Sequence, residues 1–440
     1  MFTWLAYFWQ RMRGSLWFVP SIMTSAAAFL AIVTGWLDDA DADYGAFATV
    51  LFHGGPEATR TLLSTVAGSM ITVAGVSYSI TMVAMSLASS QLGPRLLRNF
   101  RRDRSNQVVL GSFIATFLFC LMALWTGTAG VYGASLSASI ALLMATGSLF
   151  LLIYFIHHIA LSMQADYIID EVAQELRASL ALAFPEQQQE HTQAFDGSAR
   201  EWAVVAARSN GYLQSIDEAG LVRVARKHEV RLVVLRRPGH FLMESAPLVK
   251  VLGCVSVPDD LSRRIQRAFI IGGRRTADQD AEQGVHQLVE IAVRALSPSI
   301  NDPFTATTCV DRLSGVLGQV ADRPAQSAIG CDTDGQARVR FERTDFSGIV
   351  STAFDQIRQS STGVPAVAIR LIEACARIAE RSSIPARREL LAHQARMVMV
   401  GCSGSLQDED LAVLRDRYAK LLEGLDLAGS VRAPAPRPGG

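Results

Sequence analysis

The chain has 440 residues, 50% of them apolar, and its formal net charge at pH 7 is zero. This length is enough for two or three domains, and a mean hydropathy of +0.23 is high for a soluble protein. A zero net charge favours no particular partner, and we expect no nucleic-acid ligand.

Apolar residues gather in roughly the first 160 positions, which predicts a membrane region followed by a soluble one. Residues 1–14 combine aromatic side chains with two arginines, a composition typical of an interfacial segment. A transmembrane domain of four helices is expected over 15–157. Its spans are predicted at about 15–37, 61–91, 108–128 and 134–156.

The charged residues divide unequally between the loops of this domain. Residues 38–60 contain four aspartates and Glu57 against Arg60, whereas residues 92–106 contain five arginines and one aspartate. Because arginine-rich loops stay in the cytoplasm, both ends of the chain are predicted to be cytoplasmic. The expected location is the bacterial inner membrane, with a large C-terminal domain in the cytoplasm.

The second predicted span has no charge and carries a stripe of small and hydroxylated residues. Alternating steps of three and four residues place these positions on one helical face. The stripe consists of Thr65, Gly68, Thr72, Gly75, Ser79, Met82, Ser86 and Ser89. Two interpretations stay open: a seam for close helix packing, or the lining of a wet path for ions.

Polar and basic residues follow the stripe directly. Gln91, Arg95 and Arg98 would shape the inner mouth of such a pore. The arginines would equally bind anionic lipid headgroups. Their effect on the orientation of the chain in the membrane would also explain them without either role.

The rest of the chain is predicted to be an α+β domain that begins with a helical stalk over 158–185. Alternating patterns over 199–255 predict a small β-rich module, in which 236–251 is typical of a strand pair. Residues 258–430 are expected to form a helical domain, and 431–440 a disordered tail.

Two polar clusters flank one predicted helix of the C-terminal domain. Thr276 and Gln279 have the spacing of a capping box before this helix, and Asp302 and Pro303 are expected to begin the next one. If the protein forms a pore, a ligand that controls its opening is expected to contact this region. The candidate residues are Gln279, Asp280, His286, Ser297, Asn301 and Asp302. A helix break and an exposed His286–Glu290 pair explain the same residues without a ligand.

Signatures of enzyme chemistry are lacking in the sequence. It contains no phosphate-binding loop, no H-E-x-x-H and no G-x-S-x-G, and its six cysteines form no C-x-x-C pair. We therefore expect no enzymatic activity, no catalytic residue, no cofactor and no metal.

The chain resembles a family of bacterial predicted membrane proteins known as domain of unknown function 2254. The resemblance runs from about residue 15 to about 430, and its most specific parts are 69–103, 236–248 and 278–306. This chain has Ser299 where the family tends to have glycine. Where an aromatic residue commonly follows the second glycine of the stripe, this chain has Tyr78 after Ser77. The resemblance implies the topology but no activity, cofactor or catalytic residue.

Four spans do not comfortably enclose an aqueous path, so a pore would be shared between copies of the chain. The first functional hypothesis is therefore a homo-oligomeric ion or small-solute channel, controlled by its cytoplasmic domain and surrounded by membrane lipid. The alternative is a non-conducting sensor or scaffold anchored in the membrane, whose stripe is a packing seam.

Overall fold

The structure is a computed structural model, and it describes residues 17–39, 55–93, 103–126, 135–187, 195–197, 201–276 and 279–425. The chain forms two compact units, residues 1–167 and 168–440. We call them the apolar-helix unit and the α+β unit and describe each by itself. The predicted interfacial segment 1–14 and tail 431–440 lie outside the described residues.

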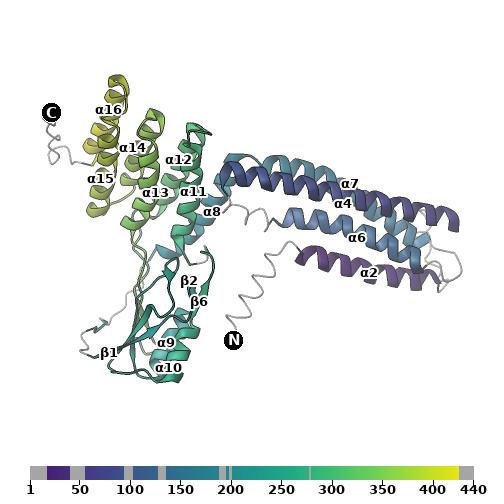
Figure 1. Ribbon diagram of the computed structural model, residues 1–440, viewed down its shortest axis with the longest axis horizontal. Helices are drawn as coiled ribbons and strands as arrows, with labels where there is room; N and C mark the ends of the chain where they lie inside the picture. The colour runs from purple at the N-terminus through teal and green to yellow at the C-terminus, as the bar shows by residue number, and fades with distance from the viewer. Residues whose placement is uncertain are drawn as a thin grey trace. The chain divides into compact units, whose positions relative to one another are not determined.

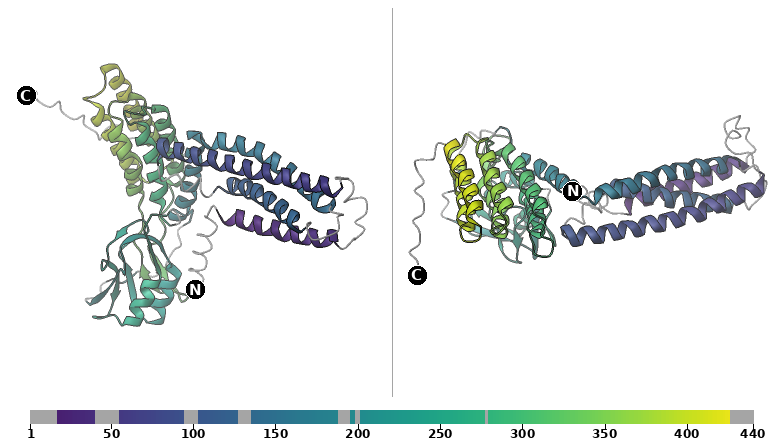
Figure 2. Two further views of the ribbon diagram at one scale, coloured as in Figure 1. Left: turned by 45° about the vertical axis from the view of Figure 1, so that its right-hand side comes forward. Right: turned by 90° about the horizontal axis from the view of Figure 1, so that it is seen from above.

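The apolar-helix unit contains four helices that are long and apolar enough to cross a membrane, which confirms this part of the prediction. Figure 2 shows them lying side by side. They are α2 (Phe18–Asp39), α4 (Pro56–Leu92), α6 (Arg104–Thr126) and α7 (Ser135–Ser162). Helix α4 begins five residues before the predicted start, because Pro56 suits the first turn of a helix. Its 37 residues correspond to roughly 55 Å, well beyond the bilayer core.

Helix α6 is the central element of this unit, and it packs against α2, α4 and α7. Half of its apolar window is buried, compared with 22% for each of the other three helices. Phe113 and Phe119 are fully buried on α6 and contribute to two apolar clusters. The interior of the four helices is thus filled with apolar side chains.

Hydrogen bonds between polar side chains also join these helices. Asp38 at the end of α2 accepts a 2.6 Å bond from the Ser137 hydroxyl and a 3.2 Å bond from its backbone N–H. The Ser148 hydroxyl of α7 lies 3.2 Å from that of Ser112 and 3.1 Å from that of Thr116, both on α6. Such bonds stabilise helix association in an apolar medium.

The range 158–185, predicted as one helical stalk, is divided between two helices. Helix α7 ends at Ser162, and a separate helix, α8 (Ala165–Ala183), follows. One face of α8 is buried in the α+β unit, through Ile168, Ile169, Val172, Ala173, Leu176 and Leu180. Burial of this apolar face makes α8 part of the core of that unit and not a bare spacer.

Two sheets and two helices form one half of the α+β unit (Figure 1). The five-stranded sheet has the order β1 (Trp202–Ala206), β5 (Pro247–Leu252), β3 (Arg231–Val234), β8 (Ala337–Arg340), β7 (Ile329–Cys331). The three-stranded sheet has the order β4 (Phe241–Leu242), β2 (Gly211–Ile216), β6 (Phe269–Gly272). All pairings are antiparallel except β3 with β8. Helices α9 (Glu218–Lys227) and α10 (Asp259–Arg267) share their core.

Two expectations for this half are wrong. The β-rich module does not end near residue 255, because β6, β7 and β8 complete its sheets from the region expected to be helical. The 236–251 segment contains β4 and β5, yet these strands do not pair with each other: β4 pairs with β2, and β5 with β1 and β3. Strand partners distant in sequence leave no local pattern that would reveal them.

Helices form the other half of the unit, together with α8 (Figure 1). They are α11 (Ala281–Ala295), α12 (Pro303–Val320), α13 (Phe346–Ser360), α14 (Pro365–Ala379), α15 (Pro385–Cys402) and α16 (Asp408–Gly424). Proline stands in the first turn of α12, α14 and α15, where its missing N–H is not needed. Neighbouring helices in the chain pack on one another, α11 on α12 and α14 on α15.

Candidate functional site

The stripe on α4 faces away from the other described helices of the apolar-helix unit. The buried positions among the described side chains of α4 are Thr59, Leu63, Ala67, Ala74, Ser77, Thr81 and Ala84, and α4 packs against α6 and α7. The stripe residues Thr65, Gly68, Thr72, Gly75, Ser79 and Ser86 are exposed, and Ser89 is half-buried. Packing of α4 within one copy therefore does not account for the stripe.

The surface of the stripe is open and locally satisfied. A Cβ atom placed on Gly68 or Gly75 would meet no atom within 4 Å. The hydroxyls of Thr65, Thr72 and Ser79 donate bonds of 2.7–2.9 Å to carbonyls one turn earlier in the helix. Each hydroxyl oxygen keeps acceptor capacity that water, an ion or another chain could use.

The predicted inner mouth falls largely outside the described residues. Gln91 lies in the last turn of α4 but its side chain is not described, and Arg95 and Arg98 lie outside the described ranges. Near them in sequence, Asp103 binds His158 of α7, with 2.6 Å between Oδ2 and Nε2. The same aspartate accepts a bond from the backbone N–H of Ser105 at the start of α6. This pair could not be predicted from the sequence because its partners are 55 positions apart.

A buried amide lies one turn further along α6. Asn106 is 1% exposed, and neither polar atom of its side chain has a hydrogen-bond partner within the described part of the chain. Buried polar groups are normally bonded because leaving them unpaired costs free energy. Nothing in the sequence distinguished Asn106 from the other polar residues near the start of α6.

Gln279, a candidate ligand residue, holds the end of a strand. Its Oε1 accepts a 2.9 Å bond from the backbone N–H of Ile216, and its Nε2 donates a 3.2 Å bond to the carbonyl of the same residue. The amide thus satisfies both backbone groups at the edge of β2, as a neighbouring strand would. The expected capping box is wrong, because α11 begins at Ala281 with Asp280 at the N-cap position.

Asp280 forms a buried ion pair. Its side chain is 1% exposed and lies 2.7 Å from the guanidinium of Arg275, which also approaches Glu282 at 3.7 Å. A Cβ on Gly239 would lie 2.5 Å from the Asp280 carboxylate, and Gly239 has a φ of +94°. Glycine is therefore required where the chain passes this ion pair.

Replacing Asp280 by asparagine is expected to destabilise the α+β unit by about 2 kcal/mol or more, because it leaves the Arg275 charge poorly compensated. Asp260→Asn is the matched control: its ion pair with Arg264 has the same 2.7 Å distance, but 59% of the Asp260 side chain is exposed. No measurable change is expected there. Thermal unfolding of the full chain in detergent measures both. Equal melting temperatures for the two variants would contradict the assignment.

The second polar cluster lies at the opposite end of α11, about 22 Å from the first for a 15-residue helix. This separation keeps the two clusters from forming one site. His286, between them, is half-buried. The Asn301 N–H donates to the Ser297 carbonyl, and Asn301 has a φ of +49°, a conformation that asparagine tolerates.

Asp302 is the N-cap of α12, which confirms the sequence prediction. Its carboxylate accepts bonds from the hydroxyl and the backbone N–H of Thr305, at 2.5 and 3.1 Å. The Thr305 hydroxyl bond lowers the pKa of Asp302 below its ordinary value of 3.8. A helix break and recap thus explains this residue.

Asp302→Ala is expected to cost about 1 kcal/mol at pH 7 through loss of the cap. Because the folded-state pKa is lowered, the carboxylate stabilises the fold above the unfolded pKa and stops doing so as pH falls through the folded pKa. The difference from the native chain should therefore shrink towards about pH 2 in urea unfolding. Asp302→Asn retains a capping oxygen and is expected to be nearly neutral at pH 7. A pH-independent deficit in the alanine variant would refute this account.

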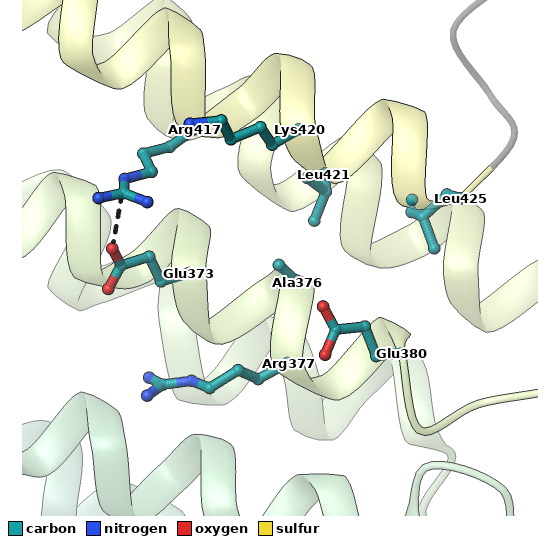
Figure 3. Close-up of a pocket in the computed structure, with 9 residues that line it drawn as sticks. Glu373, Ala376, Arg377, Glu380, Arg417, Lys420, Leu421 and Leu425 are labelled. Carbon is teal, nitrogen blue, oxygen red and sulfur yellow. Dashed lines mark ion pairs between the residues drawn. The ribbon is translucent and has the colours of Figure 1, made fainter.

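Two cavities of the α+β unit were not indicated by the sequence. One of about 300 Å³ lies between α14 and α16 (Figure 3). Glu373 and Arg417 face each other there at 3.5 Å, and Arg377 extends away to Asp311 at 2.6 Å. The other, of about 470 Å³, lies beside β7 and is lined in part by Cys331, Phe341 and Arg343.

The charged groups at the second cavity are occupied with each other. Both terminal nitrogens of Arg343 bind the Glu218 carboxylate, at 2.5 and 2.8 Å, and its Nε donates to the Ser327 carbonyl. Burial raises the pKa of the Cys331 thiol, whereas a nucleophilic cysteine requires a lowered pKa. Burial also raises the pKa of Cys375 to about 12. Within the described residues, no three His, Cys, Asp or Glu side chains are grouped to hold a metal.

Comparison with known proteins gives a consistent result over nearly the whole chain. The family described as predicted membrane protein, domain of unknown function 2254, matches residues 13–377. Uncharacterised proteins of Mycobacterium bovis and Mycobacterium tuberculosis are each 29% identical over 443 aligned residues, covering 96% of this chain and 83% of the relative. No solved structure matches the chain.

Proposed function

The chain belongs to the family of predicted membrane proteins called domain of unknown function 2254, and from this premise we propose that it is a homo-oligomeric ion or small-solute channel. The observation that carries the proposal is the exposed stripe of α4. A row of exposed hydroxyls and glycines over nearly the length of a spanning helix suits a wet surface better than lipid. The family alone supports only the membrane setting.

The pore in this proposal is shared between copies. Apolar side chains such as Phe113 and Phe119 fill much of the space around α6, and the polar side chains of Ser112, Thr116 and Ser148 there bond to one another. Copies related by rotational symmetry would bring their α4 stripes to a common axis. Gln91, Arg95 and Arg98 would then ring one mouth, and the α+β unit would control opening. No reaction, cofactor or metal is assigned to the chain.

The test is a flux assay on purified protein in liposomes, with potassium and chloride gradients measured separately. Selective flux that depends on the protein would support a channel, and the preferred ion would show whether the arginines select anions. Absence of flux at every voltage and pH, with the oligomer intact, would exclude the channel.

A second candidate function rests on the hydroxyl bonds of the stripe. Because Thr65, Thr72 and Ser79 already donate to their own helix, the stripe can pack closely against another copy without water. The protein would then be a non-conducting scaffold or sensor anchored in the membrane. The stripe variants considered in the Discussion separate the two functions.

We also propose that both ends of the chain are cytoplasmic and that the membrane is the bacterial inner membrane, on the basis of the arginines in 92–106 and the acids in 38–60. A reporter enzyme active only in the cytoplasm is expected to be active when fused after residue 425 and inactive when inserted near residue 45. The opposite pattern would reverse the orientation.

A further inference from the structure

The loop between α11 and α12 presents two large apolar side chains to the surroundings. Ile300 is 41% exposed, and Phe304, in the first turn of α12, is 85% exposed. Isolated apolar side chains on a surface are common and carry no meaning by themselves. Two further features single out this pair: local hydrogen bonds order the loop, and the loop lies level with the beginning of α8.

Local hydrogen bonds hold Phe304 in a fixed place. Asp302 caps the helix through Thr305, and the hydroxyls of Thr307 and Thr308 donate to the Phe304 carbonyl at 2.8 and 3.1 Å. The loop itself is closed by the bond from the Asp302 N–H to the Ala295 carbonyl, at 2.8 Å. The aromatic ring is therefore carried by an ordered helix start.

The position of the loop follows from the pairing of α12 with α8. These helices run in parallel, because Asp170 contacts Arg312 at 3.3 Å and the Gln326 N–H donates to the Ala183 carbonyl at 2.8 Å. Phe304 precedes Arg312 by eight positions, and Ser162 precedes Asp170 by the same number. At about 1.5 Å per residue, Phe304 lies level with the beginning of α8. Only Met163 and Gln164 separate that point from the last apolar helix, α7.

We propose that Ile300 and Phe304 form a second contact with the bilayer, at the boundary between headgroups and acyl chains. The two residues between α7 and α8 keep the beginning of α8 close along the chain to the end of the apolar helix α7. Asp302 is the sole charged residue from 296 to 305, and Thr305 engages it. An ordered aromatic ring with an aliphatic neighbour and no free charge is what the lipid interface accepts. The contact is independent of whether the protein conducts ions.

The experiment uses the full chain in phosphatidylcholine vesicles with an environment-sensitive fluorophore on an introduced cysteine. The half-buried Cys254 and Cys331 are first replaced by serine, because the other four cysteines are buried. Phe304→Cys is compared with Val255→Cys, which is 75% exposed in the connection between β5 and α10. Quenching is measured with a spin label on the lipid acyl chain and with aqueous iodide.

The label at position 304 is expected to be quenched several-fold more by the lipid spin label than the label at 255, and several-fold less by iodide. Ile300→Cys is expected to behave like Phe304→Cys. Equal iodide quenching at 304 and 255, with no lipid quenching, would place the loop in water and overturn the proposal. Protection of position 304 from both quenchers would overturn it too, because protein and not lipid would cover the loop.

Discussion

Replacing Ser79 by leucine is expected to abolish flux in liposomes while the oligomer stays intact. Ser79 lies at the middle of the exposed stripe, and its hydroxyl is already bonded to the Gly75 carbonyl. A leucine there would extend an apolar side chain into the shared path and remove the acceptor oxygen that a hydrated ion needs. Thr72→Leu, two turns earlier, is expected to have the same effect. Flux measured with the preferred ion should fall to the level of empty liposomes.

Ile80→Leu is the matched control for this experiment. Ile80 is 43% exposed on the same helix, but it stands about 100° away from Ser79 around the helix axis. The control introduces the same side chain outside the stripe, so its flux should equal that of the native chain. Native flux in both stripe variants would remove the stripe from the conducting path.

The same variants distinguish the scaffold. If the stripe is a packing seam, a leucine at Ser79 or Thr72 holds the backbones of neighbouring copies apart. The oligomer would then dissociate on size-exclusion chromatography, and the Ile80→Leu oligomer would not. Flux and assembly together thus assign the stripe to one function.

Features set by local chemistry could be predicted from the sequence. The four apolar helices follow from residue type alone, and helical periodicity places the small and hydroxylated residues of α4 on one face. Asp302 and Pro303 are a helix start that the sequence specifies within two residues. The four helices from Phe346 to Gly424 lie within the range 258–430 that was predicted to be helical.

Features set by distant partners could not be predicted. Strand β8 pairs with β3 more than 100 positions earlier, and nothing in 337–340 distinguishes a strand from a connection. Gln279 has the spacing of a capping residue, but its amide instead bonds to the backbone N–H and carbonyl of Ile216 at the end of β2. Arg275 similarly takes the Asp280 carboxylate, which looked available to a ligand. In each case a tertiary contact replaces the local one.

Helix α8 is the element through which the α+β unit would act on a channel, because it follows α7 after two residues. Close contact with α11 at Gly284 is one of the contacts that attach it to that unit. A Cβ on Gly284 would lie 3.0 Å from the Cβ and 3.3 Å from the Cα of Leu176, a fully buried residue of α8. The glycine thus lets the two helices approach closely.

Gly284→Leu is therefore expected to destabilise the α8–α11 contact by about 3 kcal/mol or more, because backbone atoms must move to admit the side chain. Gly315→Leu in α12 is the matched control: Gly315 is exposed in a helix, and a Cβ there would meet no atom within 4 Å. Leucine is the better helix former, so the control should gain up to about 1 kcal/mol. Hydrogen exchange of α8, α11 and α12 peptides from the full chain measures both variants. Exchange should become faster in α8 and α11 of the Gly284→Leu variant and slower in α12 of the Gly315→Leu variant. If leucine were harmful at any glycine, exchange would become faster in both variants. Native protection of α8 in the Gly284→Leu variant would show that other contacts hold α8.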